Sequence, residues 1–285
     1  MDFFAATMKK MPVILNEMPV ALSVAGSDCS CGAGAQADLK TFSAHGVYGL
    51  TALTCVVAEV PGRVTRIEMI AADMMAAQLS LLLHSFPVRA MKTGMVPTAD
   101  HVNALCAVLD SVPEEGRPAL VVDPVMVATC GDRLVDEPAI EALRENLFRR
   151  AVLLTPNMGE TSVLLGREIT EEGQLGDAAR ALADTFGIAV LVKGGHLDGE
   201  MAVDHLIAAD GQAHQFRSAF IPDRDTHGTG CTLSSAIVAR LALGQPLVEA
   251  VRSAKNYVHQ AIEHVLRWDG PIDALNHFAQ PTTES

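Results

Sequence analysis

Short runs rich in valine, leucine and isoleucine alternate with segments of helical spacing along most of this chain, which limits the folds open to it. The predicted strands cover residues 21–26, 50–60, 90–94, 119–125, 151–157 and 188–195. The predicted helices cover residues 34–43, 71–85, 99–109, 137–149, 171–186, 230–243 and 246–266. Most of these strands are continuous apolar runs, which is typical of strands covered on both faces. The pattern predicts an α/β fold with a mostly parallel central sheet and helices on both faces.

One segment departs from the alternation. Residues 201–219 contain two strand-like runs around Asp210 and Gly211, which predicts a β-hairpin at one edge of the sheet. No internal repeat and no linker interrupts the chain. We therefore expect a single domain over residues 20–278, with a flexible arm at residues 1–19 and a disordered tail at residues 279–285.

The composition narrows the range of partners. Of the 285 residues, 49% are apolar and 19% are charged, as in a soluble globular protein with a sizeable core. The net charge of −13 repels nucleic acid and anionic membranes, so we expect neither as a partner. No apolar run approaches the ~18 residues of a membrane span. The six scattered cysteines predict reduced thiols and a cytoplasmic location. An anionic ligand would need local positive charge from a lysine, a metal ion or a helix N-terminus.

Polar and charged residues follow the predicted strands. In an open parallel sheet, ligands bind outside the carboxyl ends of the strands. The polar residues at or just after those ends are Ser27, Asp28, Glu59, Lys92, Thr93, Asp123, Asn157, Glu160 and Lys193. Each of them alone is a weak signal, but their collection at one predicted edge indicates a ligand site.

The stretch "DTHGTGC", residues 225–231, precedes a predicted helix. Gly228 and Gly230 permit positive φ and close approach of the backbone. A glycine loop that opens a helix directs several N–H groups and the positive end of the helix dipole at one point, which suits an anion. The stretch lacks the G-x-x-x-x-G-K-[ST] pattern of a Walker loop. From these residues alone, Cys231 is a metal ligand, a nucleophile, a weak base or a small core residue.

Several segments together resemble one family. They are "AGSDCSCGAGAQADLKTFSAHGVYG", "MKTGM", "VVDPVMVATCGD", "LLTPNMGE", "VLVKGGH" and "DTHGTGCTLSSAI". They resemble the hydroxymethylpyrimidine and phosphomethylpyrimidine kinases of thiamine synthesis, which share the ribokinase-like fold with pyridoxal kinases. The resemblance runs in order from about Ala21 to Ile262. It implies a three-layer sandwich, a homodimer, and ATP-dependent phosphorylation of 4-amino-5-hydroxymethyl-2-methylpyrimidine and its monophosphate.

The resemblance also implies roles around the transferred phosphoryl group. The backbone of Gly228, Thr229, Gly230 and Cys231 would hold its oxygens, and Lys193 would supply positive charge. Asp123 and Glu160 would organise Mg²⁺, partly through water. Asn157 and Thr226 would contact the nucleotide phosphates. The residues implied for the substrate pocket are Ala33, Asp38, Glu59, Met95 and Val125.

Each role has a structural alternative. Asp123, before a proline, could simply end a strand. Asn157 and Glu160 could form a helix capping box. Lys193, before two glycines, could belong to a solvated turn, and Asp38 could be an ordinary surface carboxylate of a helix.

Cys231 takes the position of an aspartate base in other ribokinase-like enzymes. A helix N-terminus lowers a thiol pKa, so we expect a partly ionised Cys231 to accept the proton of the alcohol. Metal binding is disfavoured because His227 is the only nearby candidate ligand. A covalent intermediate is unnecessary for direct in-line transfer. Replacing Cys231 with alanine is expected to cut turnover strongly while nucleotide binding survives.

The chain departs from the family at informative positions. Glu59 stands where the pyrimidine kinases usually carry glutamine, and an ionised carboxylate can only accept hydrogen bonds. Cys29 and Cys31 replace a proline and a glycine. Ala128 stands where some pyridoxal-phosphorylating relatives carry a cysteine. A pyridoxal or pyridoxine kinase is therefore the second hypothesis and a non-catalytic pyrimidine sensor the third. Residues 128–135 and the loop at residues 59–64 are candidates for a flap over the site.

Overall fold

The computed structural model describes residues 18–126, 135–195, 200–222, 227–269 and 272–279. The predicted arm at residues 1–19 and tail at residues 279–285 lie almost wholly outside them, as do Thr226 and nearly all of the 128–135 flap candidate. None of the described helices is long and apolar enough to cross a membrane.

The described residues form one nine-stranded sheet in the order β3-β2-β1-β4-β5-β6-β7-β8-β9. The strands are β1 (Val20–Asp28), β2 (Tyr48–Val60), β3 (Arg63–Met69), β4 (Val88–Thr93), β5 (Ala119–Val122), β6 (Leu153–Leu154), β7 (Ala189–Lys193), β8 (Met201–Ile207) and β9 (Ala213–Ala219). The six strands from β2 to β7 in this order are parallel to one another. The outer strands β3, β8 and β9 are antiparallel. The mostly parallel sheet and the edge hairpin predicted from the sequence are both confirmed.

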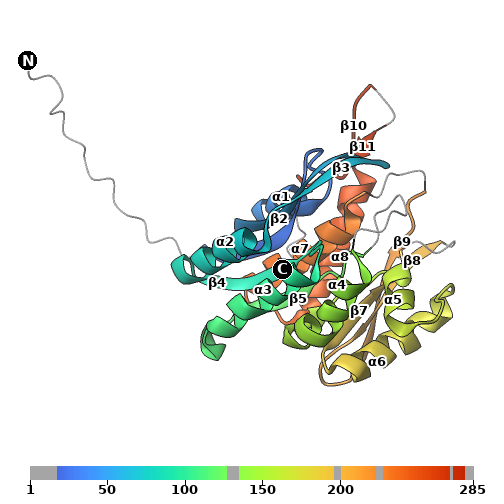
Figure 1. The fold of residues 1–285 in the computed structure, drawn as a ribbon. Helices are drawn as coiled ribbons and strands as arrows, with labels where there is room; N and C mark the ends of the chain where they lie inside the picture. The colour runs from blue at the N-terminus through green and yellow to red at the C-terminus, as the bar shows by residue number, and fades with distance from the viewer. Residues whose placement is uncertain (1–17, 127–134, 196–199, 223–226, 270–271, 280–285) are drawn as a thin grey trace, which may run out of the picture.

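Helices cover both faces of this sheet, which gives three layers (Figure 1). The helices are α1 (Gly34–Ala44), α2 (Ala72–Ser85), α3 (Ala99–Ser111), α4 (Glu137–Ala142), α5 (Met158–Leu165), α6 (Leu175–Phe186), α7 (Thr229–Ala242) and α8 (Leu247–Glu263). Helices α1, α7 and α8 share one buried apolar cluster with the sheet, and α2 to α6 share the other. Short turns extend α4 as far as Arg150, and two short strands, β10 (Leu266–Arg267) and β11 (Asp273–Ala274), follow α8.

Consecutive residues of the central strands belong to the two apolar clusters on opposite faces of the sheet. In β4, Ala90 joins the cluster with α7 and α8, whereas Met91 joins the cluster with α2 and α3. In β1, Ala21 and Leu22 divide in the same way. Both faces are buried, so the strands read as continuous apolar runs.

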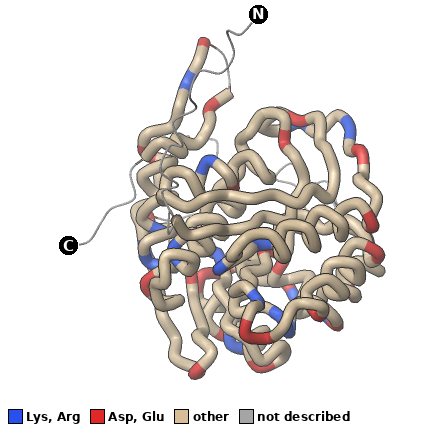
Figure 2. Tube along the Cα trace, turned by 90° about the vertical axis from the view of Figure 1, so that its left-hand side faces the viewer, with Lys and Arg blue, Asp and Glu red and all other residues tan. Residues whose placement is uncertain are grey.

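Charged residues of both signs are interspersed over the outer helices and loops (Figure 2). A few lysines are instead buried with carboxylates. Lys92, Lys193 and Lys255 pair with Asp38, Asp123 and Asp204. Local positive charge is therefore available inside a protein whose net charge is −13.

Candidate active site

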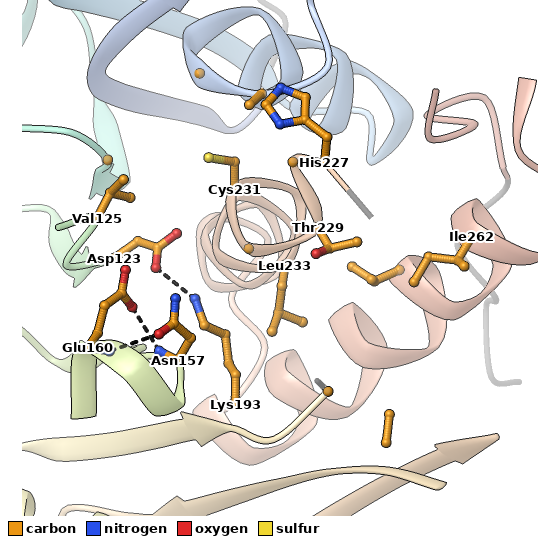
Figure 3. Close-up of a pocket in the computed structure, with 18 of the residues that line it drawn as sticks. Asp123, Val125, Asn157, Glu160, Lys193, His227, Thr229, Cys231, Leu233 and Ile262 are labelled. Atoms are coloured by element: carbon orange, nitrogen blue, oxygen red, sulfur yellow. Dashed lines mark hydrogen bonds and ion pairs between the residues drawn. The ribbon is translucent and has the colours of Figure 1, made fainter. Parts of the chain in front are cut away.

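A cavity of about 510 Å³ lies at the carboxyl ends of the parallel strands, against the start of α7. Almost all the residues predicted for the site line it. They are Ala33, Glu59, Met95, Asp123, Val125, Asn157, Glu160, Lys193, Gly228, Thr229, Gly230 and Cys231. Figure 3 shows Thr229, Cys231 and Leu233 on α7, seen close to end-on. The predicted edge of the sheet therefore does carry a site.

The glycine loop before α7 requires a backbone that other residues rarely adopt. Gly228 caps the helix with φ +84°, in the left-handed region that favours glycine. A Cβ atom at this position would overlap the carbonyl oxygen of Gly32. The first N–H groups of an α-helix have no partner within the helix and carry the positive end of its dipole. The first turn of α7, at residues 229–231, therefore directs its backbone amides toward the cavity.

A lysine–aspartate pair lies beside this turn. Lys193 Nζ is 2.9 Å from Asp123 Oδ1, and Ser234 of α7 donates to Asp123 Oδ2 at 3.1 Å. A Cβ atom at Gly230 would be 3.2 Å from Lys193 Nζ, so the ammonium lies directly against the start of the helix. Burial alone would raise the pKa of Asp123, but Lys193 and Lys92 lower it. Asp123 is therefore ionised and buried, and Lys193 is not the solvated turn residue of the structural alternative.

Asn157 and Glu160 form the capping box that was considered as their structural alternative. The Asn157 N–H donates to Glu160 Oε2 at 2.8 Å, and the Glu160 N–H donates to Asn157 Oδ1 at 2.9 Å. Both residues nevertheless line the cavity. Burial, with Asp123 nearby, raises the pKa of Glu160 to about 7, although Lys193 opposes the shift. Capping α5 and lining the site are compatible.

The two buried carboxylates of Asp123 and Glu160 suit a magnesium ion. Among the described residues, no group of three or more histidine, cysteine, aspartate or glutamate side chains could hold a metal on its own. Mg²⁺ prefers oxygen ligands and is commonly bound by one or two carboxylates, waters and substrate phosphates. This donor set fits an ion that arrives with a phosphorylated ligand rather than a resident metal centre.

Asp28 organises the loop that faces Gly228. Its carboxylate accepts from the N–H groups of Ser30, Gly32 and Ala33 at 2.7, 3.1 and 2.8 Å, and lies 3.4 Å from His227 Nε2. Burial would raise the pKa of Asp28, but these hydrogen bonds, led by His227, lower it to about 2. This anchoring places the Gly32 carbonyl against Gly228.

Replacing Asp28 with asparagine is expected to make the free energy of unfolding less sensitive to low pH. A carboxylate whose folded pKa is lowered stabilises the fold above its unfolded pKa, and the effect is lost as the pH falls through the folded value. The change from 3.8 to about 2 corresponds to about 2 kcal/mol at neutral pH. Between pH 5 and pH 3, urea titrations should show the wild type losing about 1 kcal/mol more stability than D28N.

The matched control is Asp110→Asn, which removes an exposed carboxylate paired with Arg150. Exposed pairs contribute little, so D110N should keep nearly the acid sensitivity of the wild type. Equal acid sensitivity in D28N and the wild type would contradict the anchoring role of Asp28.

Three expectations about the site are wrong. Asp38 does not line the cavity: it faces inward from α1, and its side chain is wholly buried. The 59–64 segment is not an open loop, because Glu59 pairs with Val64 in the tight hairpin of β2 and β3. The pKa of Cys231 is not lowered: burial raises it to about 11, outweighing the opposing charge of Lys92. Cys231 is therefore a neutral thiol near pH 7.

Sequence reasoning missed one wall of the cavity. This wall consists of residues of β8, β9 and α8 and the segment after β9, among them Ala202, Ser218, Phe220, Val258, His259 and Ile262. Figure 3 shows Ile262 on the opposite side of the α7 start from Val125. The cavity therefore has two ends, one near Met95 and Val125 and one near Ile262, with the polar group around Asp123 and Lys193 between them.

Solved structures of vitamin kinases share this architecture. A Bacillus subtilis pyridoxal kinase in an ADP complex matches with a TM-score of 0.82 and 36% identity, over 92% of this chain and 98% of that chain. Phosphomethylpyrimidine kinase from Clostridium difficile 630 matches with a TM-score of 0.74 and 36% identity, over 86% of this chain and 99% of that chain. Fold and site together define a ribokinase-like vitamin kinase.

Sequence comparison identifies the family within this class. The model of the phosphomethylpyrimidine kinase family matches residues 28–273. Hydroxymethylpyrimidine/phosphomethylpyrimidine kinase of Rhizobium meliloti is 45% identical over 265 residues, covering 91% of this chain and 97% of that protein. The enzyme of the same name from Synechococcus elongatus is 40% identical, covering 92% and 98%. The chain belongs to the phosphomethylpyrimidine kinase family.

Proposed function

We propose that this protein transfers the γ-phosphoryl group of ATP to 4-amino-5-hydroxymethyl-2-methylpyrimidine, and then phosphorylates the resulting monophosphate, in thiamine biosynthesis. Residues 20–278 act as one kinase unit. The observation that carries the proposal is the start of α7, where Gly228 has φ +84° and Lys193 lies against Gly230 in the middle of the cavity. Relatives at 40–45% identity bear the name of this activity.

The arrangement suits phosphoryl transfer. That reaction passes through a loose transition state, so catalysis consists of positioning and charge stabilisation. The backbone amides of Thr229, Gly230 and Cys231 hold the transferring oxygens, as at other helix N-termini that bind phosphate. Lys193 adds a positive charge against the same turn. The ATP sugar and base lie toward Ile262, and the alcohol lies at the opposite end of the cavity.

The remaining polar residues organise the nucleotide phosphates. Asn157 lies beside them, and Thr226, which lies outside the described residues, is expected to contact them as well. Asp123 and Glu160 would hold Mg²⁺, which would supply positive charge to the nucleotide phosphates. Both carboxylates would be ionised when they hold the ion, because a nearby positive charge would lower the pKa of Glu160.

The pyrimidine end of the cavity consists of Ala33, Glu59, Met95 and Val125. Burial raises the pKa of Glu59, and Asp28 raises it further, against the opposing charge of His227. A protonated carboxyl donates one hydrogen bond and accepts another, as a glutamine amide does. Glu59 can therefore serve both a ring nitrogen and the exocyclic amine of an aminopyrimidine.

Replacing Glu59 with glutamine is expected to remove a pH dependence of pyrimidine binding. As the pH rises above the raised pKa of Glu59, the wild type loses its donor, and KM should increase by up to about tenfold, the value of one buried hydrogen bond. E59Q keeps its donor at every pH, so its KM should increase less than that of the wild type as the pH rises. Both proteins are compared at pH values at which the free pyrimidine is neutral, because a protonated ring would pair with a carboxylate but not with an amide.

Glu68→Gln on β3 is the matched control, because the Glu68 side chain is exposed and pairs with Arg66. E68Q should follow the wild-type pH profile. If E59Q also followed it, Glu59 would not contact the pyrimidine through a carboxyl proton.

Assembly and location form part of the proposal. Strands β3 and β9 end the sheet and leave unpaired backbone groups, which a second copy would cover in a homodimer. Among the described residues the cysteines are free thiols, which favours a reducing cytoplasm. The expected partners are small pyrimidine or pyridine alcohols, with neither nucleic acid nor membrane.

A B6-vitamer kinase is the second candidate, because pyridoxal kinases match this fold with a TM-score of 0.82. Coupled assays of ADP release with hydroxymethylpyrimidine, its phosphate, pyridoxine and pyridoxal separate the candidates. We expect turnover with the first two. Turnover confined to the B6 vitamers would replace the proposed function, and ADP release with none of the four would favour a pyrimidine sensor.

A further inference from the structure

A second lysine–aspartate pair lies beneath the start of α7, away from the cavity. Lys92 Nζ of β4 is 2.8 Å from Asp38 Oδ1 of α1, and both side chains are wholly buried. Ser23 of β1 donates to the other carboxylate oxygen at 2.5 Å. These residues connect α1, β1 and β4 below the phosphate-binding turn.

Two consecutive serines tie α7 to both ion pairs. Ser234 donates to Asp123, which pairs with Lys193. Ser235 donates to Asp38 Oδ1 at 2.5 Å, and Asp38 pairs with Lys92. The first turns of α7 are therefore held by the same lysine–aspartate–serine arrangement on two sides, once at the cavity wall and once in the core.

Lys92, of the pair buried in the core, also contacts the first turn of α7 directly. Lys92 Nζ also contacts the carbonyl oxygen of Cys231 at 3.4 Å. Burial would lower the pKa of Lys92, but Asp38, Cys231 and Asp123 together raise it, so its ammonium stays charged. This cation lies immediately behind the residue whose amide and thiol face the cavity.

Stability does not explain this pair. Desolvating two charges can cost as much as their attraction returns, and apolar residues of similar volume are often equally stabilising. A fixed positive charge behind an anion site in a low-dielectric interior does favour developing negative charge. The pair is therefore better explained by a contribution to phosphoryl transfer than by a contribution to the stability of the fold.

We propose that Lys92 is a positioning residue for phosphoryl transfer. Held by Asp38, it fixes the Cys231 carbonyl and the first turn of α7, and it places a second positive charge behind that turn. The inference rests on the proposed function and extends it to a side chain that touches neither nucleotide nor alcohol.

The first test compares Lys92→Met with the double variant Lys92→Met and Asp38→Asn. The single variant leaves a buried carboxylate uncompensated and should be strongly destabilised. The double variant removes both charges and should recover most of the melting temperature. Its kcat should nevertheless remain about tenfold to a hundredfold below the wild type, with KM for ATP changed less than threefold. Recovery of kcat together with stability would show a merely structural pair and overturn the inference.

The second test needs no substrate. A thiol reacts with iodoacetamide through its thiolate, whose population depends on nearby charge. Lys92 lowers the pKa of Cys231 more than Asp38 raises it, so peptide-resolved mass spectrometry should show Cys231 of the double variant reacting more slowly than in the wild type at the same pH. The control is Lys255→Met with Asp204→Asn, which removes another buried pair, between α8 and β8. That variant should keep the wild-type rate at Cys231.

If Cys231 reacted with iodoacetamide at the same rate in the two double variants, the charge of Lys92 would not act on the first turn of α7, and the inference would be wrong. Failure of the proposed function has a different signature, because a wild type inactive toward all four substrates would still show the difference in thiol reactivity.

Discussion

Replacing Gly228 with alanine is expected to reduce phosphotransfer by at least about a hundredfold, because the new methyl group displaces the turn that holds the phosphoryl oxygens. The added Cβ overlaps the Gly32 carbonyl oxygen, and it also meets Ala33. The backbone of Gly32 and Ala33 cannot move away from the new methyl group, because the N–H groups of both residues donate hydrogen bonds to Asp28. The measurement is kcat in a coupled ADP-release assay, with the melting temperature recorded in parallel.

Gly244, after the end of α7, provides the matched control. Its φ is +85°, nearly that of Gly228, but a Cβ atom there would have no heavy atom within 4 Å. G244A should lose about 1 kcal/mol for an alanine in the left-handed region and keep the wild-type kcat. Equal kcat values for G228A and G244A would mean that the turn at Gly228 does not bind the reacting phosphate.

Replacing Cys231 with alanine is expected to lower kcat by about a hundredfold or more, the usual contribution of a positioned base, with little change in KM for ATP. The raised pKa of about 11 leaves little thiolate at pH 7. The thiolate fraction therefore grows about tenfold per pH unit up to the pKa, and wild-type kcat should increase with pH between 7 and 9. C231A should lack this increase.

Cys106 of α3 offers the control for this change, because it is also buried but lies in the opposite apolar cluster. C106A should cost some stability and retain both kcat and its dependence on pH. If C231A turned over at the wild-type rate, the backbone amides of the turn would be the sole catalytic contribution of this loop.

The strand–helix alternation was sufficient to predict the layers and the edge hairpin, because burial on both faces leaves a clear apolar pattern. Two elements had no such pattern. Strand β3 has no fully buried residue, since it lies at the sheet edge. Helix α5 has eight residues, and its start is marked only by the capping box at Asn157 and Glu160. Short or exposed elements leave too little periodicity to detect.

The polar half of the site was predictable because parallel strands bring their carboxyl ends to one edge. Side-chain direction was not, and Asp38 shows why: its position in α1 was correct, but it points to the buried Lys92 rather than to the cavity. The cavity wall that includes Phe220 and Ile262 was not predicted, because its formation depends on where the β8–β9 hairpin and α8 pack in three dimensions. For Cys231, burial and helix position act on the pKa in opposite directions, and their balance depends on three-dimensional surroundings.

Helix α7 is both the wall of the cavity and the centre of one core layer, with ten of its fourteen residues buried. The amide hydrogens of this buried part, from Thr232 onward, exchange with solvent only when that layer opens, which ties their exchange to the global unfolding free energy. The phosphate-binding turn at residues 229–231 lies directly before this buried part, so it begins a helix that the core holds in place. A substitution that loosens this core layer should therefore also displace the turn that binds the phosphate, although it lies far from the reacting atoms.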